Sequence, residues 1–262
     1  GNGAVAGVAA NMADKHFEIW AIDYAKPKVI APGVNFRQVP MERLSEATDL
    51  PKNFDLVTGQ FAIEYGETEN VLKQIQNVLK PGGKGIFVIH HKDSFWVERA
   101  RSLTEQVAWA MRTGIFETAQ RYAKDLSGGD LAALRNAMEN FEAEIKTRKG
   151  VRADHEVLSY ILRSMMGFVY EARDGRLEGL SDRILAAQAQ WNNTAWVKDH
   201  MVETAFDENA MAGFKAALET SGFNMLKIEP WQTQGKIRAQ EKELTVAWRV
   251  EIQKPVAVPA VS

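Results

Sequence analysis

Hydrophobic and polar positions alternate along the chain in a way that divides it into three stretches. In the first, residues 1 to about 93, short apolar runs alternate with turns and with segments of helical spacing. Four of these runs predict strands, over Phe17–Ile22, Val34–Val39, Phe54–Gly59 and Gly85–His90. Strands that alternate with helices in this rhythm predict an α/β fold with a mostly parallel sheet and helices on both of its faces.

One helix of this first stretch is well defined by its spacing. Residues Thr68–Leu79 carry their large apolar side chains at helical intervals on one face. The segment Lys80–Gly83 contains a proline and two glycines, so we expect it to end the helix and to turn the chain into the next strand.

The second stretch, from about Ser94 to Ala205, has no strand pattern. It predicts four helices, over residues of about 95–124, 129–148, 153–173 and 179–198. Because this stretch follows a strand at the edge where parallel sheets bind ligands, we expect it to cover the site and to shape a substrate pocket. A dimerisation bundle that forms a homodimer is the alternative, and the two roles are compatible.

The third stretch returns to the α/β pattern. Glu208–Thr220 predicts a helix, and Phe223–Glu229 and Leu244–Ile252 predict two strands. We expect these strands to pair antiparallel, because no crossover helix fits between them. The predicted domains are the first part of the core, the helical insertion and the last part of the core, at residues 1–93, 94–205 and 206–262.

Composition narrows the classes of function. With 45% hydrophobic and 25% charged residues the chain is an ordinary globular protein, and no run approaches the roughly 18 apolar residues of a membrane span. The formal net charge of −2 gives no overall field that would attract nucleic acid or an anionic membrane. The absence of cysteine excludes disulfides, thiolate zinc sites and cysteine nucleophiles, and with no visible signal peptide we expect a cytoplasmic protein.

The start of the chain carries the first indication of a ligand site. Gly1-Asn2-Gly3 opens an apolar helical run, and the strand after it ends in Asp23. A glycine turn lets a nucleotide approach the backbone, and a carboxylate about 20 residues further on can hold two ribose hydroxyls. Since a strand usually precedes such a turn, we expect this strand to lie upstream of Gly1.

The whole pattern resembles the class I S-adenosylmethionine (SAM)-dependent methyltransferases. Gly1-Asn2-Gly3 matches the last two glycines of their glycine-rich turn, and Asp23 in AIDYAK matches the acidic residue that ends the second strand. FDLV at Phe54–Val57 matches the fourth strand, and LKPGGKGIFVI at Leu79–Ile89 matches the turn and the fifth strand. The two C-terminal strands match the antiparallel close of the sheet, while the helical stretch is unmatched.

This resemblance implies a Rossmann-like, mostly parallel seven-stranded sheet closed by an antiparallel strand pair, with a large all-helical insertion after the fifth strand. It also implies SAM as the cofactor and S-adenosylhomocysteine as the product. Gly1 and Gly3 would let the cofactor approach the first turn, and Asp23 would hold its ribose with Tyr24 beside it. A different nucleotide-binding Rossmann-like protein is the alternative.

The expected adenine site departs from the family pattern. Many members place an aspartate near position 40, where this chain has Pro40, which offers neither a side-chain acceptor nor a backbone donor. We therefore expect the backbone around Met41, the Met41 side chain and Glu42 to hold adenine. The alternative is that Met41 and Glu42 are ordinary residues of a loop that leads into a helix.

Gln60 and Phe61 directly follow the fourth strand of the pattern. Because ligands sit beyond the carboxyl ends of the strands in an open parallel sheet, we expect both to line the edge where the methyl group is transferred. The segment is not the Asn/Asp-Pro-Pro-aromatic motif of many methyltransferases that act on bases, which argues against a nucleic-acid substrate. Core packing is the alternative for Phe61, and Glu64 and Tyr65 are expected simply to open a helix.

His90 and His91 end the fifth strand at the same edge, and either could take a proton from a hydroxyl or amine nucleophile. Adjacent residues on a strand point to opposite faces, so at most one of them faces the cavity. Two adjacent histidines do not easily reach one metal ion, and no carboxylate cluster completes a ligand shell, so no metal site is predicted. Structural and substrate-shaping roles are the alternatives.

Together these residues predict transfer of the SAM methyl group to a small-molecule acceptor by in-line attack on the sulfonium methyl. The rate would come from alignment of the reacting atoms and from desolvation. A methyltransferase that acts on RNA or protein is one alternative, and a SAM-binding regulatory or scaffold protein without transfer activity is another.

Overall fold

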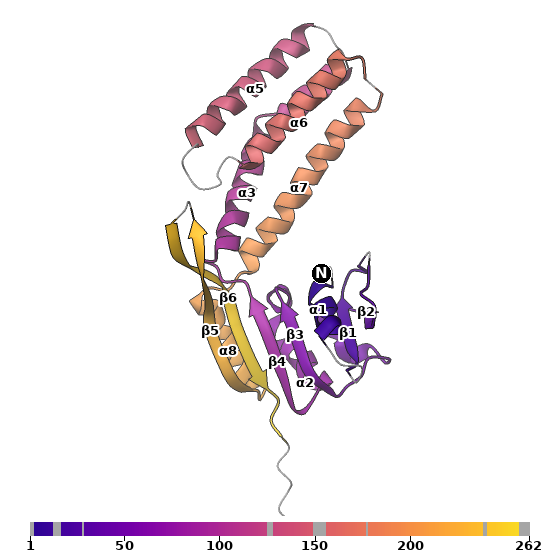
Figure 1. Ribbon diagram of the computed structural model, residues 1–262, viewed down its shortest axis with the longest axis vertical. Coiled ribbons are helices and arrows are strands. Elements are labelled where there is room, and N and C mark those ends of the chain that lie inside the picture. The colour runs from indigo at the N-terminus through magenta and orange to yellow at the C-terminus, as the bar shows by residue number, and fades with distance from the viewer. Residues whose placement is uncertain are drawn as a thin grey trace, which may run out of the picture. The chain divides into compact units, whose positions relative to one another are not determined.

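The computed structural model describes residues 3–12, 17–27, 29–124, 128–148, 156–176, 178–237 and 240–256. The chain divides into two compact units (Figure 1). The sheet unit consists of residues 1–94 and 204–262, and the helical unit consists of residues 95–203. Among the described helices, none combines the length and the apolar character that a membrane crossing requires.

The sheet unit contains every strand that the sequence predicts. Its strands are β1 (Ile19–Asp23), β2 (Val34–Gln38), β3 (Phe54–Gln60), β4 (Leu79–Ile89), β5 (Asn224–Ile237) and β6 (Gln240–Gln253). Its helices are α1 (Ala4–Met12), α2 (Thr68–Val78) and α8 (Glu208–Thr220), with short 3-10 helices η1 (Met41–Glu46) and η2 (Ile63–Tyr65).

The strands of this unit form two sheets. β1 and β2 pair in parallel, and the other four strands form a sheet in the order β3-β4-β6-β5. β3 and β4 are parallel, whereas β6 pairs antiparallel with both β4 and β5. The antiparallel pairing predicted for the last two strands is confirmed, and the fold is α/β with a mixed sheet.

The prediction of one mostly parallel seven-stranded sheet is wrong. In a Rossmann-type strand order the first strand lies between the second and the fourth, which here are β1 and β3. No described residue forms a strand in that position, and β1 and β3 are each the end strand of their own sheet. Hydrogen-bonded strands lie only about 4.8 Å apart. β1 and β3, which would both neighbour the first strand, therefore do not form backbone hydrogen bonds with each other.

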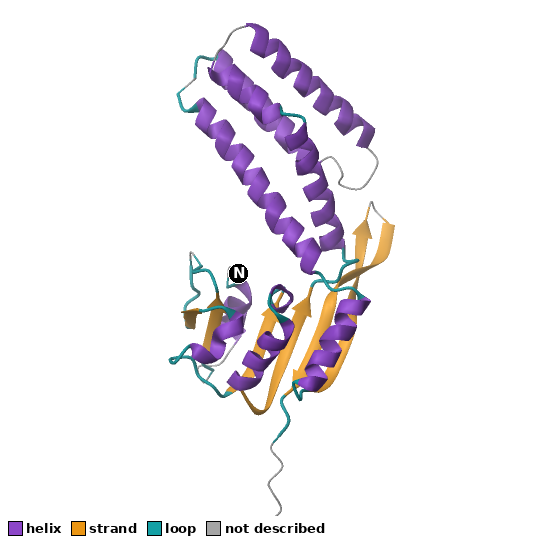
Figure 2. Cartoon of the chain, turned by 180° about the vertical axis from the view of Figure 1, so that it is seen from behind, coloured by secondary structure: helices purple, strands orange, loops and turns teal. Residues whose placement is uncertain are grey.

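Two helices cover one face of the four-stranded sheet. α2 and α8 lie on the same side of the strands in Figure 2 and contact each other. α2 begins where the Glu67 carboxylate accepts hydrogen bonds from the backbone N–H groups of Glu69 and Asn70, at 3.1 and 2.8 Å. The core beneath the two helices is apolar, with Leu72, Ile75, Phe87, Ile89, Phe214, Leu218, Trp248 and Val250 all buried.

A smaller apolar cluster connects the two sheets. Leu44 and Leu50, from η1 and the segment after it, are buried against Val78 at the end of α2. Trp20 of β1 and Phe54 of β3 pack against this cluster. The β1–β2 pair is therefore held beside β3 by side-chain packing instead of by backbone hydrogen bonds.

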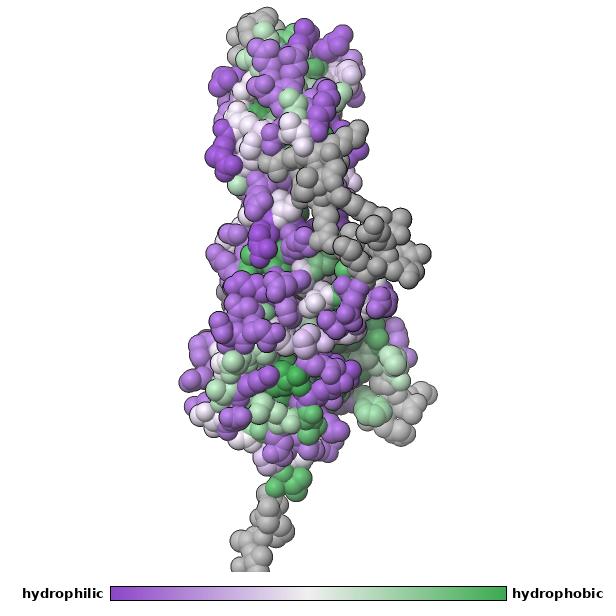
Figure 3. Space-filling model, turned by 90° about the vertical axis from the view of Figure 1, so that its left-hand side faces the viewer, coloured by the Kyte–Doolittle hydropathy of each residue, from purple (hydrophilic) through white to green (hydrophobic). Residues whose placement is uncertain are grey.

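The described residues of the helical unit form five helices. They are α3 (Phe95–Arg112), α4 (Ile115–Lys124), α5 (Gly128–Arg148), α6 (Glu156–Arg173) and α7 (Leu180–Thr204). The single helix predicted over 95–124 is wrong, because Gly114 takes a left-handed conformation, with φ of 68°, that separates α3 from α4. On the face drawn in Figure 3 this unit presents mostly hydrophilic residues, while its own core lies among the helices.

Candidate functional site

The carboxyl ends of β3 and β4 lie side by side, because Gln60 pairs with Val88 in the parallel ladder. The chain leaves β3 at Phe61, whose N–H donates to the carbonyl of Val88 at 2.7 Å. Phe61 has φ of 53°, a left-handed conformation that costs a non-glycine residue about 1–2 kcal/mol. In this sharp turn the Phe61 ring stacks on the imidazole of His90, with centroids 4.0 Å apart and an interplanar angle of 19°.

The side chains of Glu64 and His90 are buried at this edge and lie within ion-pair distance of each other. Oε1 of Glu64 lies 2.6 Å from Nδ1 of His90 and accepts a second hydrogen bond, at 3.1 Å, from the His90 backbone N–H. The two side chains are 0% and 6% exposed, respectively. The expectation that Glu64 simply opens a helix is therefore incomplete: it lies in η2, but its carboxylate binds the end of β4.

Tyr65 also contacts the His90 ring. Its ring meets the imidazole edge-on, with centroids 6.2 Å apart. Burial raises the pKa of the Tyr65 hydroxyl, the charge of Glu64 raises it further, and a hydrogen bond with Thr204 acts in the opposite direction. The hydroxyl therefore stays protonated at neutral pH.

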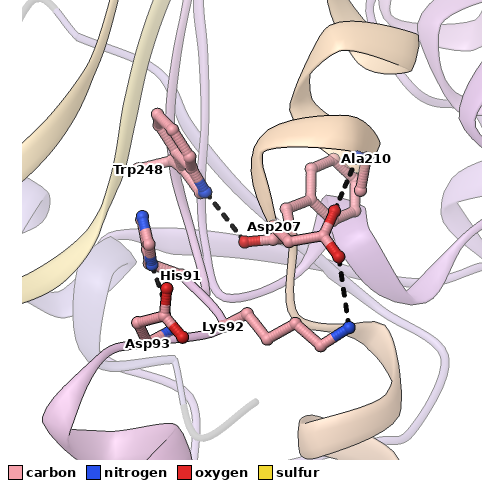
Figure 4. A network of polar contacts seen from close by, with 7 residues as sticks. His91, Lys92, Asp93, Asp207, Ala210 and Trp248 are labelled. Atoms are coloured by element: carbon pink, nitrogen blue, oxygen red, sulfur yellow. Dashed lines mark hydrogen bonds and ion pairs between the residues drawn. The ribbon is translucent and has the colours of Figure 1, made fainter.

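His91 has entirely different surroundings. Its Nδ1 accepts a hydrogen bond from the backbone N–H of Asp93 at 3.0 Å (Figure 4). Its ring stacks on Trp248, with centroids 4.6 Å apart and an interplanar angle of 23°. The two adjacent histidines are both buried, and they face different partners, as alternation along a strand requires.

The segment before α8 anchors the chain around both histidines. The N–H of Phe206 donates to the carbonyl of His90 at 2.8 Å, and the carbonyl of Phe206 accepts from the N–H of Lys92 at 2.9 Å. The same carbonyl accepts from Nε1 of Trp248 at 2.9 Å (Figure 4). The end of β4 is thus held in place by residues more than 110 positions later in the chain, which sequence periodicity does not reveal.

Asp207, which follows Phe206, makes a contribution to stability that depends on pH. Its carboxylate caps α8 by accepting from the N–H of Ala210 and also accepts from Lys92, at 2.9 and 3.2 Å (Figure 4). The Ala210 hydrogen bond first, and then Lys92, lower the pKa of the Asp207 carboxyl below its usual value. A carboxyl with a lowered pKa stabilises the fold above its unfolded pKa of about 3.9, and this contribution is lost as the pH falls through the folded pKa.

We therefore expect the stability advantage of the wild type over Asp207→Asn to be full at pH 7 and to shrink steadily below about pH 4. Urea denaturation of both proteins between pH 3 and pH 7 measures this difference. An advantage that stays constant across that range would contradict the prediction.

The residues predicted to approach the cofactor tail lie around α1 and β1. Gly1 lies outside the described residues. Gly3 has φ of 74°, and no heavy atom lies within 4 Å of the position that a Cβ would take, so its backbone is open to a ligand. Gly3 and Ala21 line one small apolar hollow. Asp23 follows Ala21 by two positions, so its side chain lies on the same face of β1.

Asp23 is fixed by local hydrogen bonds at the end of β1. Its Oδ1 accepts from the N–H of Ala25 at 2.8 Å, and its carbonyl accepts from the N–H of Val39 at 3.0 Å. Tyr24 is 77% exposed, and its carbonyl accepts from Nε2 of Gln38 at 3.1 Å. The carboxylate is thus oriented by the turn that follows the strand.

Met41 and Glu42 open η1 and lie against Gly66. A Cβ on Gly66 would lie 2.7 Å from Oε1 of Glu42, 3.2 Å from Cε of Met41 and 2.6 Å from a methyl of Val71. A side chain at position 66 would therefore have to displace Val71 and Glu42, where η1 approaches the segment that follows β3. Sequence reasoning missed Gly66, although a glycine directly after Tyr65 is a signal of such a close approach.

The structure thus brings the predicted residues together in two groups. One group, Gly3 and Asp23, lies around α1 and β1. The other lies at the ends of β3 and β4, where Gln60, Phe61 and His90 lie, with Met41 and Glu42 against the adjoining Gly66. Glu64 and Tyr65, which were not predicted as site residues, join this second group through His90. Within the described part of the chain, no three His, Asp or Glu residues are placed to hold a metal ion.

The comparison with known protein families matches the first third of the chain. Residues 1–87 match the family model described as a methyltransferase domain. No curated protein matches the chain.

Two solved structures resemble the chain at low identity. One was reported for the conversion of a disulfide bond into a thioacetal group during echinomycin biosynthesis, with 9% identity, a TM-score of 0.41, and coverage of 100% of this chain and 75% of that one. The other is a possible exported protein from Bordetella parapertussis, with 14% identity, a TM-score of 0.35, and coverage of 91% and 54%. At these scores neither likeness supports a conclusion about this chain. The family match stands by itself: residues 1–87 match the methyltransferase-domain family, which supports the resemblance to class I SAM-dependent methyltransferases.

Proposed function

We propose that the protein transfers a methyl group from SAM to a small-molecule acceptor. The observation that carries the proposal is the match of residues 1–87 to a methyltransferase domain. When bound, SAM supplies an electrophilic methyl on a sulfonium centre and is converted to S-adenosylhomocysteine. The protein has to hold the nucleophile, the methyl carbon and the sulfur in line and to exclude water.

The residues around α1 and β1 fit this cofactor. The open backbone of Gly3 lets a ligand come close to the start of α1, whose N–H groups point toward the turn. The Asp23 carboxylate, oriented by the N–H of Ala25, is suited to accept hydrogen bonds from two ribose hydroxyls. We assign Gly1 and Tyr24 to the same region on the family pattern.

The other predicted residues are assigned to the remaining parts of the cofactor and to the acceptor. Met41 and Glu42, at the start of η1, are assigned to adenine. Gln60 and Phe61 are assigned to the edge where the methyl group is transferred, and His90 and His91 are the candidate bases. The helical unit is proposed as a cover for the substrate or as a dimer interface, and a cytoplasmic location stays a prediction.

A binding measurement on Asp23 tests the cofactor assignment. Asp23→Ala should weaken SAM binding at least about tenfold, because each hydrogen bond to a charged group contributes about 1.5–3 kcal/mol. Isothermal titration with SAM and with S-adenosylhomocysteine measures both affinities.

Asp55→Ala is the matched control. Asp55 lies near the amino end of β3, where it pairs with Lys80, so this variant should bind as the wild type does. If Asp23→Ala also binds SAM with unchanged affinity, Asp23 does not hold the ribose. If the wild type binds SAM but transfers no methyl group to any acceptor, the protein acts as a SAM-binding regulator instead.

A further inference from the structure

The Glu64 carboxylate is placed in a way that helix geometry alone does not explain. Its side chain is fully buried, and its Oε2 has no hydrogen-bond partner among the described residues. Burying a carboxylate is unfavourable unless a positive or hydrogen-bonding partner compensates it. The group that can supply a hydrogen bond here is the His90 imidazole, whose Nδ1 lies 2.6 Å from Oε1.

The hydrogen-bond partners determine where each histidine carries its proton. An ionised carboxylate only accepts, so Nδ1 of His90 is the protonated nitrogen and Nε2 keeps a lone pair. Nδ1 of His91 accepts from the N–H of Asp93, so its proton lies on Nε2. Of the two candidate bases, His90 therefore has a nitrogen lone pair that is not already used.

The His90 ring is also held from several sides. Phe61 stacks on its face and Tyr65 meets its edge, while Glu64 binds both its Nδ1 and its backbone N–H. Among the described residues, Glu64 is the one hydrogen-bond partner of the His90 side chain, which leaves Nε2 for a ligand. An imidazole with a fixed plane and one unused lone pair meets the geometric requirement for a general base.

The geometry points to a Glu64–His90 dyad in which Nε2 of His90 takes the proton of the acceptor and Glu64 is the positioning residue. This inference rests on the proposed function and selects its acceptor: a hydroxyl compound. A base assists a hydroxyl most, because a neutral amine already offers a free lone pair.

The methyl transfer and the proton transfer together conserve atoms and charge. The acceptor oxygen bonds to the methyl carbon as the carbon–sulfur bond breaks with its electron pair left on sulfur. The O–H bond of the acceptor breaks, and its proton goes to Nε2 of His90. The resulting imidazolium is paired with the Glu64 carboxylate, which stays ionised.

Nitrogen NMR of the histidine rings tests the dyad without an acceptor or an activity assay. In the ¹⁵N-histidine-labelled full chain, we expect His90 to carry its proton on Nδ1 with a preference of at least about tenfold, which one charge-assisted hydrogen bond supports. His91 is the internal control, with the opposite tautomer in the same spectrum. The His90→Gln and His91→Gln variants assign the two sets of signals.

Two substitutions separate positioning from a purely structural role. Glu64→Gln keeps an acceptor oxygen and should retain the Nδ1–H form, whereas Glu64→Ala should lose the preference. If Glu64→Ala does not fold, the wild type and Glu64→Gln decide the result. A wild-type His90 with its proton on Nε2, or a preference unchanged in a folded Glu64→Ala protein, would overturn the dyad.

The acceptor class has its own test, in which the probes are catechol and aniline, each supplied with SAM and assayed for S-adenosylhomocysteine. We expect the rate with catechol to exceed the rate with aniline by at least tenfold, and an equal or higher rate with aniline overturns the hydroxyl assignment. Titration with S-adenosylhomocysteine alone is run in parallel. Absence of binding there would contradict the proposed function while the ring spectra still decide the dyad.

Discussion

Replacing Phe87 by alanine should lower the free energy of unfolding of the sheet unit by about 3–5 kcal/mol, the range typical of buried Phe→Ala substitutions. Phe87 is 1% exposed and lies near the carboxyl end of β4. A Cβ on Gly59 would lie 3.3 Å from its ring and a Cβ on Gly85 would lie 2.7 Å from it, so the ring fills the space that two glycines leave open. Neither glycine has a side chain that could move into the cavity.

Urea denaturation followed by tryptophan fluorescence measures this loss. Phe87→Leu keeps much of the buried volume and should lose less than half as much stability as Phe87→Ala. Phe17→Ala is a surface control, because Phe17 is 70% exposed and its replacement should change stability by less than about 0.5 kcal/mol. A Phe87→Ala variant as stable as the surface control would show that β4 does not pack as described.

Phe141→Ala should destabilise the helical unit by a similar amount, about 3–5 kcal/mol, and leave the sheet unit protected. Phe141 is fully buried in α5, and its ring lies against Trp109 of α3, with centroids 4.8 Å apart. Its apolar cluster is formed by residues of the helical unit, whereas the clusters around α2 and β4 are formed by the sheet unit. Loss of packing in one cluster should therefore act first on its own unit.

Hydrogen–deuterium exchange resolves the two units in one experiment. Peptides from α3 to α7 should exchange faster in Phe141→Ala, while peptides from α2 and β4 should exchange as in the wild type. Tyr170→Ala is the control within the same unit, because Tyr170 is 55% exposed. Equal loss of protection in both units would show that they unfold as one cooperative body.

Local patterns predicted most elements well, and the exceptions have physical causes. The helix over Glu208–Thr220 has the predicted bounds because its cap, Asp207, and the Ser221-Gly222 stop directly flank the segment. The break at Gly114 was missed because apolar spacing continues across it, and a single glycine is compatible with a helix until its φ is known. Every predicted strand is present, but the turn predicted at Lys80–Gly83 is wrong because this segment lies inside β4, and β5 and β6 are longer than predicted. The division of the strands into two sheets was not predicted, because pairing depends on which strands become neighbours.

The candidate site was predicted in part for the same reason. Phe61 and His90 follow from their position at the ends of adjacent parallel strands, which an α/β pattern specifies. Glu64 gives no such signal, because its partner lies 26 positions away and a glutamate at the start of a short helix is common. Gly66 is explained only by the approach of Glu42 and Met41.

The amino-acid sequence by itself determined the order of the elements, the glycine turn followed by Asp23, and the match of residues 1–87 to the methyltransferase-domain family. These features are local, since helical and strand periods and turn residues act over a few neighbouring positions. Only the tertiary structure decided which of the adjacent histidines faces a carboxylate and which nitrogen keeps a lone pair. Proton placement on an imidazole depends on the groups that folding brings within about 3 Å of it, and no spacing along the chain contains that information.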